Sequence, residues 1–308
     1  MAGWTTTDIP DLTGRVAVVT GANSGLGYVT ARELARRGAR VVLGCRSEAR
    51  GRQAVERLVG EVPQASVELG RLDLGDLASV REFADRLPHD RLDLLVNNAG
   101  LMAVPYGTTA DGFETQFGVN HLGHFALTGL LLPRLLAAPG ARIVTVSSMM
   151  HALANIDIRD LDSRRRYGRW IAYARSKSAN LLFTHELARR LAAQGADAVA
   201  AAAHPGYAAT DLQTAGPRAE GRRAAEWMMK AANRLFAQPA GAGALPTLYA
   251  ATAPGVRPDS YFGPSFAMWR GAPVPSRRAP WTVDDAVSRR LWQQSVRLTG
   301  VSYDGLEE

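Results

Sequence analysis

Short apolar runs alternate with amphipathic stretches along most of the chain. Runs rich in β-branched or small apolar residues, which are typical of buried strands, occupy 15–20, 40–45, 66–74, 93–100, 141–148 and 197–206. Between them, apolar positions recur at helical spacing in 26–38, 48–60, 76–87, 111–137 and 171–194. Strands that alternate with helices indicate βαβ units, and therefore a mostly parallel sheet that helices cover on both faces.

The pattern loosens after Pro205, where residues 207–238 are rich in Ala, Arg and Met. The elements predicted beyond this stretch are a helix at 240–254, a short strand at 260–264, a proline-rich loop at 270–280 and a helix at 282–299. No internal repeat or long linker divides the chain. Since crossovers between parallel strands are right-handed, we expect an α/β fold with a doubly wound sheet, the Rossmann topology, as a single domain over 1–308.

The composition is that of an ordinary globular protein. With 46% hydrophobic and 21% charged residues, the chain is not collagen-like, disordered or a coiled coil. One cysteine excludes an intramolecular disulfide framework and a Cys-rich zinc site. No window approaches the ~18 consecutive apolar residues of a membrane-spanning helix, and the first residues lack the features of a secretory signal. We therefore expect a soluble, cytoplasmic protein with no membrane span.

The charge is strongly basic, with a formal net charge of +7. Only two of the basic residues are lysines, Lys177 and Lys230, and the arginines scatter over many predicted helices. A nucleic-acid binder would concentrate this charge on one face and interleave it with aromatic residues. The basic charge therefore does not predict a nucleic-acid partner.

A glycine-rich turn, TGANSGLG at 20–27, joins the first predicted strand to the first predicted helix. Glycine permits a positive φ and lets the backbone approach a pyrophosphate, while the N-terminus of the following helix offers oriented N–H groups. The alternative is a simple tight turn, but the position of the motif in a βαβ unit favours a dinucleotide site. The residues expected to contact the dinucleotide here are Gly21, Asn23, Ser24, Gly25, Leu26 and Gly27.

The spacing of these glycines, G-x-x-x-G-x-G, resembles that of the short-chain dehydrogenase/reductase family. The resemblance covers about residues 13–265 and leaves 266–308 as a C-terminal extension on the substrate side. Asp73 and Leu74 match the family's adenine-contacting pair, and Asn98, Ala99 and Gly100 match its NNAG signature. The turn that contacts the nicotinamide end of the cofactor is matched by His204, Pro205 and Gly206, with Thr210 beyond it.

The end of the second predicted strand indicates which nucleotide is bound. An acid there would hydrogen-bond the 2′-hydroxyl of NAD, whereas an arginine would pair with the 2′-phosphate of NADP. The chain carries Gly44, Cys45 and Arg46, with no acid at the strand end. Arg46 therefore favours NADP(H) over NAD(H). A surface arginine in an arginine-rich chain is the alternative interpretation, and Glu48 nearby leaves the preference open.

Tyr173 and Lys177 stand four residues apart in a predicted helix, and this spacing places both side chains on one face. The pKa of a free tyrosine is near 10, and an adjacent ammonium is expected to stabilise the phenolate and lower that pKa. One of only two lysines in an arginine-rich chain occupies this position, which favours a proton-transfer role. The alternative is a solvated Tyr–Lys pair.

The family resemblance implies two further catalytic residues. Ser148, the second serine of the pair that ends the fifth strand, would hydrogen-bond the substrate carbonyl, and Ser147 would contact the backbone or the cofactor instead. Asn120 matches the family's helix asparagine, whose main-chain carbonyl anchors a relay water. Asn120, Ser148, Tyr173 and Lys177 thus reproduce the family's catalytic tetrad in chain order. The resemblance also implies that Tyr173 and Lys177 contact the cofactor, with Lys177 at the nicotinamide ribose.

Several motifs resemble the retinol dehydrogenase and protochlorophyllide reductase-like branch of this family, among them VNHLGHF at 119–125 and the 25-residue step from Ser148 to Tyr173. Two features depart from that branch. We expect no N-terminal membrane anchor of the kind that many retinol dehydrogenases carry. The only cysteine, Cys45, lies at the cofactor end, which argues against a light-driven reduction that uses an active-site cysteine.

The substrate end is less well defined by the sequence. Methionine and aromatic side chains suit an adaptable apolar pocket, although they could equally be ordinary core. The candidates are Met149, Met150, Tyr207, Trp227, Met228, Met229, Phe236 and Trp269. His121 and His124 lie three residues apart, but no further ligand set completes a metal site, so we expect no metal.

Together these features predict an NADP(H)-dependent oxidoreductase that interconverts a lipophilic ketone or aldehyde and its alcohol. The alternatives are a non-catalytic NADP-sensing regulator, which would not need the Tyr–Lys pair, and a sugar-nucleotide epimerase or dehydratase, which would need a larger C-terminal domain. A small-molecule carbonyl or alcohol is the expected partner. In the resembled family the helices at 111–137 and 171–194 form dimers. Residues 149–172 could cover one of these surfaces, so both a monomer and a homo-oligomer are open.

Overall fold

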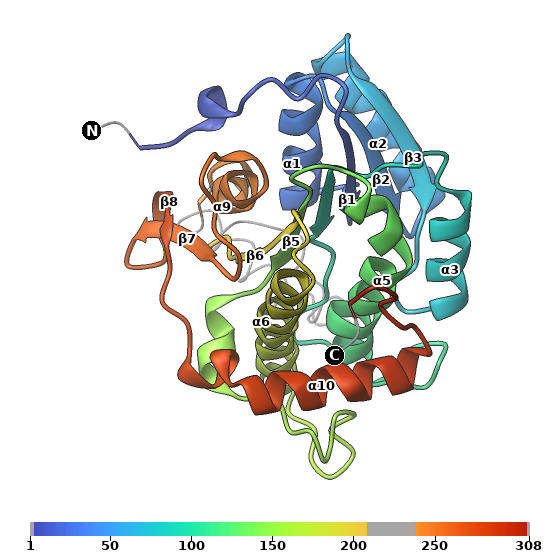
Figure 1. Ribbon diagram of the computed structural model, residues 1–308, viewed down its shortest axis with the longest axis vertical. Coiled ribbons are helices and arrows are strands. Elements are labelled where there is room, and N and C mark those ends of the chain that lie inside the picture. The colour runs from blue at the N-terminus through green and yellow to red at the C-terminus, as the bar shows by residue number, and fades with distance from the viewer. Residues whose placement is uncertain (1–2, 208–237, 307–308) are drawn as a thin grey trace, which may run out of the picture.

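The computed structural model describes residues 3–207 and 238–306, which fold around one eight-stranded sheet (Figure 1). The strands lie in the order β3-β2-β1-β4-β5-β6-β7-β8, and all neighbouring pairs are parallel except β7 and β8. In chain order they are β1 (Val16–Thr20), β2 (Arg40–Cys45), β3 (Ser66–Arg71), β4 (Leu94–Asn97), β5 (Arg142–Val146), β6 (Val199–Ala203), β7 (Tyr261–Phe266) and β8 (Arg270–Pro275). The predicted doubly wound, mostly parallel sheet is confirmed.

Helices lie on both faces of the sheet (Figure 1). They are α1 (Gly25–Arg36), α2 (Glu48–Glu61), α3 (Leu77–Arg86), α4 (Thr115–Phe117), α5 (Gly123–Leu136), α6 (Arg169–Ala193), α9 (Ala240–Thr252) and α10 (Asp285–Thr299). Short turns of 3₁₀-helix complete the described elements: η1 (Thr6–Asp8), η3 (Met149–Leu153) and η4 (Pro280–Val283).

The side chains of β1 alternate between two hydrophobic cores. Val18 packs into the core shared with α3, α5 and α6, whereas Ala17 and Val19 pack into the core shared with α1, α2 and α9. All three side chains are fully buried. Because successive residues of a strand point to opposite faces and both faces are covered, the strand sequence is a continuous apolar run.

One segment predicted as a loop is a strand. Within 270–280, residues Arg270–Pro275 form β8 and pair antiparallel with β7. Pro273 and Pro275 cannot donate a ladder hydrogen bond, and proline is tolerated in strands chiefly at sheet edges. As the last strand of the sheet, β8 is such an edge, which explains why a proline-rich sequence is extended here.

The helix predicted at 111–137 is shorter and interrupted. It begins at Thr115 with α4, continues as the π turn η2 (Gly118–Leu122), and becomes regular only in α5. The Gly123 N–H donates to the Gly118 carbonyl, five residues earlier, which is the π spacing. Asn120 lies inside this turn, so a candidate catalytic residue occupies the irregular part of the helix.

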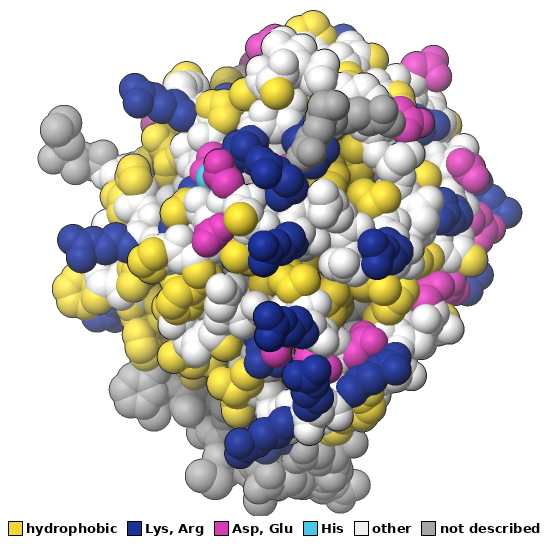
Figure 2. Space-filling view, turned by 60° about the horizontal axis from the view of Figure 1, so that its bottom comes forward, with side chains coloured by type: hydrophobic (Ala, Val, Ile, Leu, Met, Phe, Trp, Pro, Cys, Tyr) yellow, Lys and Arg dark blue, Asp and Glu magenta, His cyan; other side chains and the backbone are white. Residues whose placement is uncertain are grey.

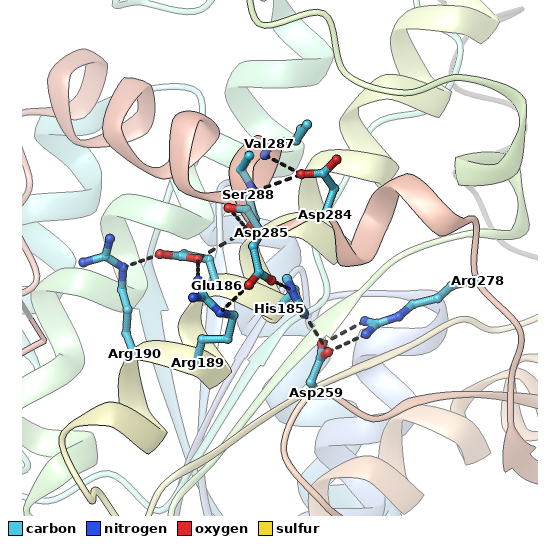
Figure 3. Close-up of polar contacts among 11 residues, drawn as sticks. His185, Glu186, Arg189, Arg190, Asp259, Arg278, Asp284, Asp285, Val287 and Ser288 are labelled. Atoms are coloured by element: carbon cyan, nitrogen blue, oxygen red, sulfur yellow. Dashed lines mark hydrogen bonds and ion pairs between the residues drawn. The ribbon is translucent and has the colours of Figure 1, made fainter. Parts of the chain in front are cut away.

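The C-terminal helix α10 lies across α6 (Figure 1), where Leu291 and Leu182 belong to one buried cluster. Polar side chains fix the contact at its edge (Figure 3). His185 of α6 bonds Asp285 of α10 through Nε2 at 2.9 Å and Asp259 through Nδ1 at 2.7 Å. The two carboxylates thus join α10 and the loop before β7 to one imidazole of α6.

The last described residues, 300–306, pack against α5. The Tyr303 hydroxyl donates a hydrogen bond of 2.6 Å to the Phe125 carbonyl, and its ring lies 4.9 Å from the Phe125 ring. Residues 149–172, the predicted cover of a helix surface, contribute η3, and the Ser178 hydroxyl of α6 shares its proton between the His151 carbonyl of η3 and the Ala154 carbonyl just after it. Residues 149–172 also pack against α6, since Ile156 belongs to one buried cluster with Ala179 and Leu182, so this stretch and α10 share the cover of α6 while the C-terminal residues cover α5.

Arginine side chains on the face shown in Figure 2 are interspersed with acidic and apolar side chains and do not gather into one patch. On this face the positive charge is therefore distributed as the sequence predicts. Within 3–207 and 238–306, no helix has both the length and the apolar character needed to cross a bilayer.

Candidate active site

A cavity of about 710 Å³ opens along the carboxyl ends of the parallel strands, where doubly wound sheets bind ligands. All predicted site residues in the described part of the chain line it except Asn120, which lies behind its wall. They are Gly21, Asn23, Ser24, Gly25, Leu26, Gly27, Arg46, Asp73, Leu74, Asn98, Ala99, Gly100, Ser148, Tyr173, Lys177, Pro205 and Gly206. Thr210 lies outside the described residues. The fold thus gathers side chains from six strand ends around one cavity.

The glycine turn forms a cradle that larger residues would block. Gly21 and Gly25 have φ of 66° and 54°, in the region that favours glycine. A Cβ on Gly27 would lie 2.5 Å from the Gly21 carbonyl oxygen. The N-cap of α1, Ser24, makes no side-chain capping hydrogen bond, so the N–H groups of the first turn are left to a ligand. This arrangement fits the diphosphate of a dinucleotide.

Two arginines line the cavity at the end of β2, where the sequence predicts the adenosine part of the cofactor. Arg46 follows β2, and Arg50 lies one turn further, on α2. Neither guanidinium has an ion-pair partner among the described residues. Glu48, the acid that left the cofactor preference open, does not line the cavity and instead pairs with Arg52. The local charge facing the cavity is therefore positive, and Arg50 is a cavity residue that the sequence motif alone did not identify.

The neighbouring walls are fixed by hydrogen bonds. Asp73 accepts from the Gly75 N–H at 3.0 Å, which sets the turn after β3. The Asn98 amide donates to the Thr20 carbonyl at 2.8 Å, which ties the turn after β4 to the start of the glycine turn. These bonds position the two turns that border the adenosine end and the floor of the cavity.

The turn after β6 is held by His204. Its Nδ1 accepts from the Gly206 N–H at 3.2 Å, and its Nε2 donates to the Ser276 hydroxyl at 2.9 Å. Burial lowers the pKa of His204 to about 4, so the ring is neutral and this tautomer is fixed by its partners. Gly206 then has a φ of 63° and lines the cavity beside Tyr207.

Tyr173 and Lys177 lie on one face of α6, as their spacing predicts, and both are almost fully buried. The Lys177 ammonium donates to the Val146 carbonyl at 3.0 Å. Burial lowers the pKa of Lys177 to about 8. Burial also raises the pKa of Tyr173 to about 12, and a hydrogen bond with Ser148 acts in the opposite direction. The expected lowering of the Tyr173 pKa by Lys177 is not seen, because burial of the phenol dominates.

The two serines after β5 have different surroundings. The Ser147 hydroxyl donates to the Lys177 carbonyl at 2.9 Å, so it holds the backbone of α6. Ser148 lines the cavity and hydrogen-bonds the Tyr173 side chain. Ser148 and Tyr173 can therefore approach one atom of a ligand together, whereas Ser147 is committed to the fold.

Asn120 uses its side chain for structure. Its Oδ1 accepts from the Leu101 N–H at 2.7 Å, and its Nδ2 donates to the Leu101 carbonyl and to the Ser176 hydroxyl, each at 2.9 Å. A Cβ on Gly100 would lie 3.1 Å from Asn120 Oδ1 and 3.6 Å from Lys177 Nζ, so both groups border Gly100. The functional group that Asn120 can still offer is its main-chain carbonyl, which accepts from His124 Nδ1 at 3.0 Å and, like any carbonyl, has two lone pairs.

Apolar side chains form the remaining wall. Met149, Met150 and Tyr207 line the cavity as predicted, and Tyr207 packs against Trp269 with ring centroids 4.9 Å apart. Trp227, Met228, Met229 and Phe236 lie outside the described residues. Sequence reasoning did not identify several other apolar lining residues, among them Leu101, Met102, Val119 and Trp170. They belong to loops and helix starts whose orientation only the fold determines.

The two histidines of VNHLGHF are buried and bond to oxygen atoms. His121 Nε2 lies 2.8 Å from the Ser295 hydroxyl of α10. His124 contacts the Thr20 hydroxyl and the Asn120 carbonyl. In the described part of the chain, no three His, Cys, Asp or Glu side chains are grouped so that they could hold a metal ion.

Comparison with known proteins extends these observations over nearly the whole chain. The sequence model described as short chain dehydrogenase matches residues 15–221. Retinol dehydrogenase 12 of Homo sapiens is 41% identical over 297 residues, covering 95% of this chain and 89% of that protein. Retinol dehydrogenase 13 of Homo sapiens is 40% identical over 313 residues, covering 96% and 87%. The crystal structure of an uncharacterized protein from Mycobacterium paratuberculosis aligns with a TM-score of 0.82 and 46% identity, covering 98% and 99%.

Proposed function

This chain belongs to the short-chain dehydrogenase family and is an NAD(P)-dependent oxidoreductase acting on alcohols and carbonyl compounds, and we propose that it uses NADP(H) to reduce a lipophilic ketone or aldehyde. The observation that carries the proposal is the common cavity. Tyr173, Lys177 and Ser148 line it at one end, and Arg46 and Arg50 line it at the other.

Binding of the cofactor follows from the charges and the backbone. Gly21, Gly25 and Gly27, with the first turn of α1, would hold the diphosphate. Arg46 and Arg50 would pair with the 2′-phosphate that distinguishes NADP from NAD. When bound, the nicotinamide supplies the hydride, and the protein supplies position and electrostatics.

Tyr173 is the proposed general acid. Since its pKa is raised to about 12, the hydroxyl is protonated at neutral pH, which is the form that reduction requires. Its proton goes to the carbonyl oxygen as that oxygen gains negative charge. Ser148, which already bonds Tyr173, donates a second hydrogen bond to the same oxygen.

Lys177 stabilises the charge left on Tyr173. With a pKa of about 8, its ammonium is mostly protonated at neutral pH. Asn120 would hold a water that returns a proton toward Lys177, through the main-chain carbonyl that its side-chain bonds leave available. The chain's own groups thus account for the proton delivered, and its replacement would come from solvent through the water at Asn120.

The apolar wall supports a lipophilic substrate. Met149, Met150 and Trp170 border the cavity near Tyr173, and methionine side chains adapt to bulky apolar ligands. The similar proteins named retinol dehydrogenases suggest that retinal and related long-chain aldehydes are suitable first substrates.

The test is a rate measurement with NADPH and a panel of carbonyl compounds that includes retinal, long-chain aldehydes, cyclic ketones and short hydrophilic aldehydes. We expect loss of NADPH absorbance and formation of the alcohol, fastest with the lipophilic compounds. Tight NADPH binding without turnover of any compound would instead support the NADP-sensing regulator. Equal rates with hydrophilic and lipophilic aldehydes would refute the assigned substrate class.

A further inference from the structure

His124 connects the Asn98–Ala99 turn, which lines the cavity, to Asn120, which lies behind the cavity wall. Its Nδ1 lies 3.0 Å from the Asn120 carbonyl oxygen, and its Nε2 lies 2.9 Å from the Thr20 hydroxyl. That hydroxyl in turn accepts from the Asn98 and Ala99 N–H groups, each at 2.9 Å. Thr20 ends β1, the Asn98 turn follows β4, and His124 opens α5, so the contacts join three elements.

These partners fix the ring in one tautomer. A carbonyl oxygen only accepts, so Nδ1 carries the proton and donates to Asn120. Burial lowers the pKa of His124 to about 4, so Nε2 is bare at neutral pH and accepts from the Thr20 hydroxyl. Every bond then runs in the same direction, from the N–H groups of Asn98 and Ala99 to the Asn120 carbonyl, an arrangement in which hydrogen bonds strengthen one another.

The chain of bonds ends beside the proposed catalytic lysine. The Asn120 side chain and the Lys177 ammonium both border Gly100, and the charge of Lys177 contributes to the low pKa of His124. A protonated imidazole here would repel that ammonium, and a neutral one does not. The π turn at Gly118–Leu122 takes the carbonyls out of regular helical alignment, so the direction of the Asn120 carbonyl needs a separate restraint.

We propose that His124 is a positioning residue for the carbonyl reduction, holding the Asn120 main-chain carbonyl and the Asn98–Ala99 turn in one hydrogen-bonded unit. The inference rests on the proposed function for its kinetic consequences, but not for its geometry. The Asn98–Ala99 turn lines the cofactor cavity, whereas Asn120 lies on the proton-relay side. The two ends of the imidazole therefore affect two different measurable quantities.

Two substitutions of His124 by residues with an amide side chain test the two ring nitrogens one at a time. Asparagine places its amide near Nδ1 and can still donate to the Asn120 carbonyl, but it does not reach Thr20. Glutamine places its amide near Nε2 and can still accept from Thr20, but it leaves the Asn120 carbonyl without its donor. We expect His124→Asn to keep kcat and raise the KM for NADPH. We expect His124→Gln to keep that KM and lower kcat about tenfold, the effect of one misdirected hydrogen bond.

His121→Asn is the matched control. His121 is equally buried, in the π turn directly before α5, but its ring bonds Ser295 of α10 instead of Thr20 and the Asn120 carbonyl. We expect this variant to lower Tm and to leave kcat and the KM for NADPH unchanged. If both His124 variants behaved like His121→Asn, with lower Tm and unchanged kinetics, the positioning role would be refuted.

The nitrogen NMR spectrum of the histidine rings tests the geometry without any turnover. In the wild-type protein we expect one ring, absent from the spectrum of His124→Asn, with its proton on Nδ1 and no titration across neutral pH. A proton on Nε2, or a ring that becomes protonated near pH 7, would overturn the inference. Lack of turnover by wild-type protein with every carbonyl compound would overturn the proposed function alone.

Discussion

The Lys177 ammonium nitrogen lies 5.8 Å from the centre of the Tyr173 ring, one helical turn away on α6. Because both groups are buried, each has lost most of the solvation of its charged form, and the pKa of Tyr173 rises while that of Lys177 falls. The site at rest therefore combines a protonated phenol with an ammonium that titrates near pH 8. In the proposed reduction, the charge on Lys177 stabilises the phenolate that forms when Tyr173 gives up its proton.

Removal of the Tyr173 hydroxyl removes the proposed acid but little else. We expect Tyr173→Phe to lower kcat by roughly 10²- to 10⁴-fold, the usual contribution of a general acid. The Kd for NADPH, measured by fluorescence titration, should change little. Tyr167→Phe is the control, because Tyr167 donates to the Val104 carbonyl and does not line the cavity. Full activity of Tyr173→Phe would exclude Tyr173 as the acid.

The pKa of Lys177 predicts how the rate depends on pH. Below about 8 the ammonium is charged and can stabilise the Tyr173 phenolate, and above that value the charge is lost. We expect kcat for carbonyl reduction to be level near neutral pH and to fall as pH rises through about 8. Lys177→Met should have a low kcat without this fall. A wild-type rate that rises through the same range would contradict the assigned role.

Cofactor preference should depend on the two arginines at the adenosine end. We expect Arg46→Ala and Arg50→Ala each to weaken NADPH binding roughly 10- to 100-fold, because each removes a charge-assisted hydrogen bond, and to change NADH binding little. Arg52→Ala is the matched control from the same helix, since Arg52 pairs with Glu48 and does not line the cavity. Equal losses for NADPH and NADH would show that the 2′-phosphate is read elsewhere.

The sequence was sufficient to predict the strands and site residues that depend on short, local sequence patterns. The apolar runs gave the parallel strands because both faces of each strand are buried, as Val18 and Val19 illustrate. The glycine spacing and the rare Lys177 identified the cavity, because few residues can replace them there. Ser148 could be separated from Ser147 only by resemblance, and the structure supplies the reason in the bond from Ser147 to the Lys177 carbonyl.

Features that depend on contacts between distant segments were not predictable. Arg270–Pro275 contains prolines and is a strand only because it lies at the edge beside β7. The pKa of Tyr173 depends on burial by the whole fold, which the spacing to Lys177 does not reveal. His124 could not be distinguished from His121 in the sequence, and they differ only in which element packs against each ring.

The imidazole between two carboxylates in Figure 3 makes stability depend on pH. Hydrogen bonds to Asp259, and then to Asp285, raise the pKa of His185 above its ordinary 6.5. Its contribution is therefore full below pH 6.5 and is lost as pH rises through the raised value. The pKa values of Asp259 and Asp285 are lowered from 3.8, so their contribution is present above that pH and lost further into acid.

We therefore expect His185→Gln to have a lower Tm than the wild type at pH 5.5, with the difference shrinking as pH rises above 6.5. His121→Gln is the control. The pKa of His121 is lowered by burial to about 3, so its ring stays neutral in the fold while the unfolded chain is protonated below 6.5, and its Tm difference should shrink as pH falls, the opposite of His185→Gln. A Tm difference for His185→Gln that grows with pH would contradict the assigned charge state.

The C-terminal residues predict the oligomeric state. Helix α10 lies across α6, and Tyr303 is bonded to the Phe125 carbonyl of α5, so these residues cover the helices that form dimers in the resembled family. A second copy of the chain could bind there only after displacing Val301 and Tyr303, which are buried. We expect light scattering to give the mass of a monomer, 33.1 kDa. A dimer mass at micromolar concentration would contradict this.

A variant at Gly129 of α5 tests whether the C-terminal residues prevent dimer formation. A Cβ there would lie 2.7 Å from the Val301 side chain and 2.8 Å from that of Tyr303. We expect Gly129→Leu to push these residues away from α5 and expose its apolar face, so that the mass rises with concentration. Gly60→Leu is the control, because no atom lies within 4 Å of a Cβ at Gly60. If Gly129→Leu stayed monomeric although Tyr303 no longer contacted α5, residues 300–306 would not be the cause of the monomeric state.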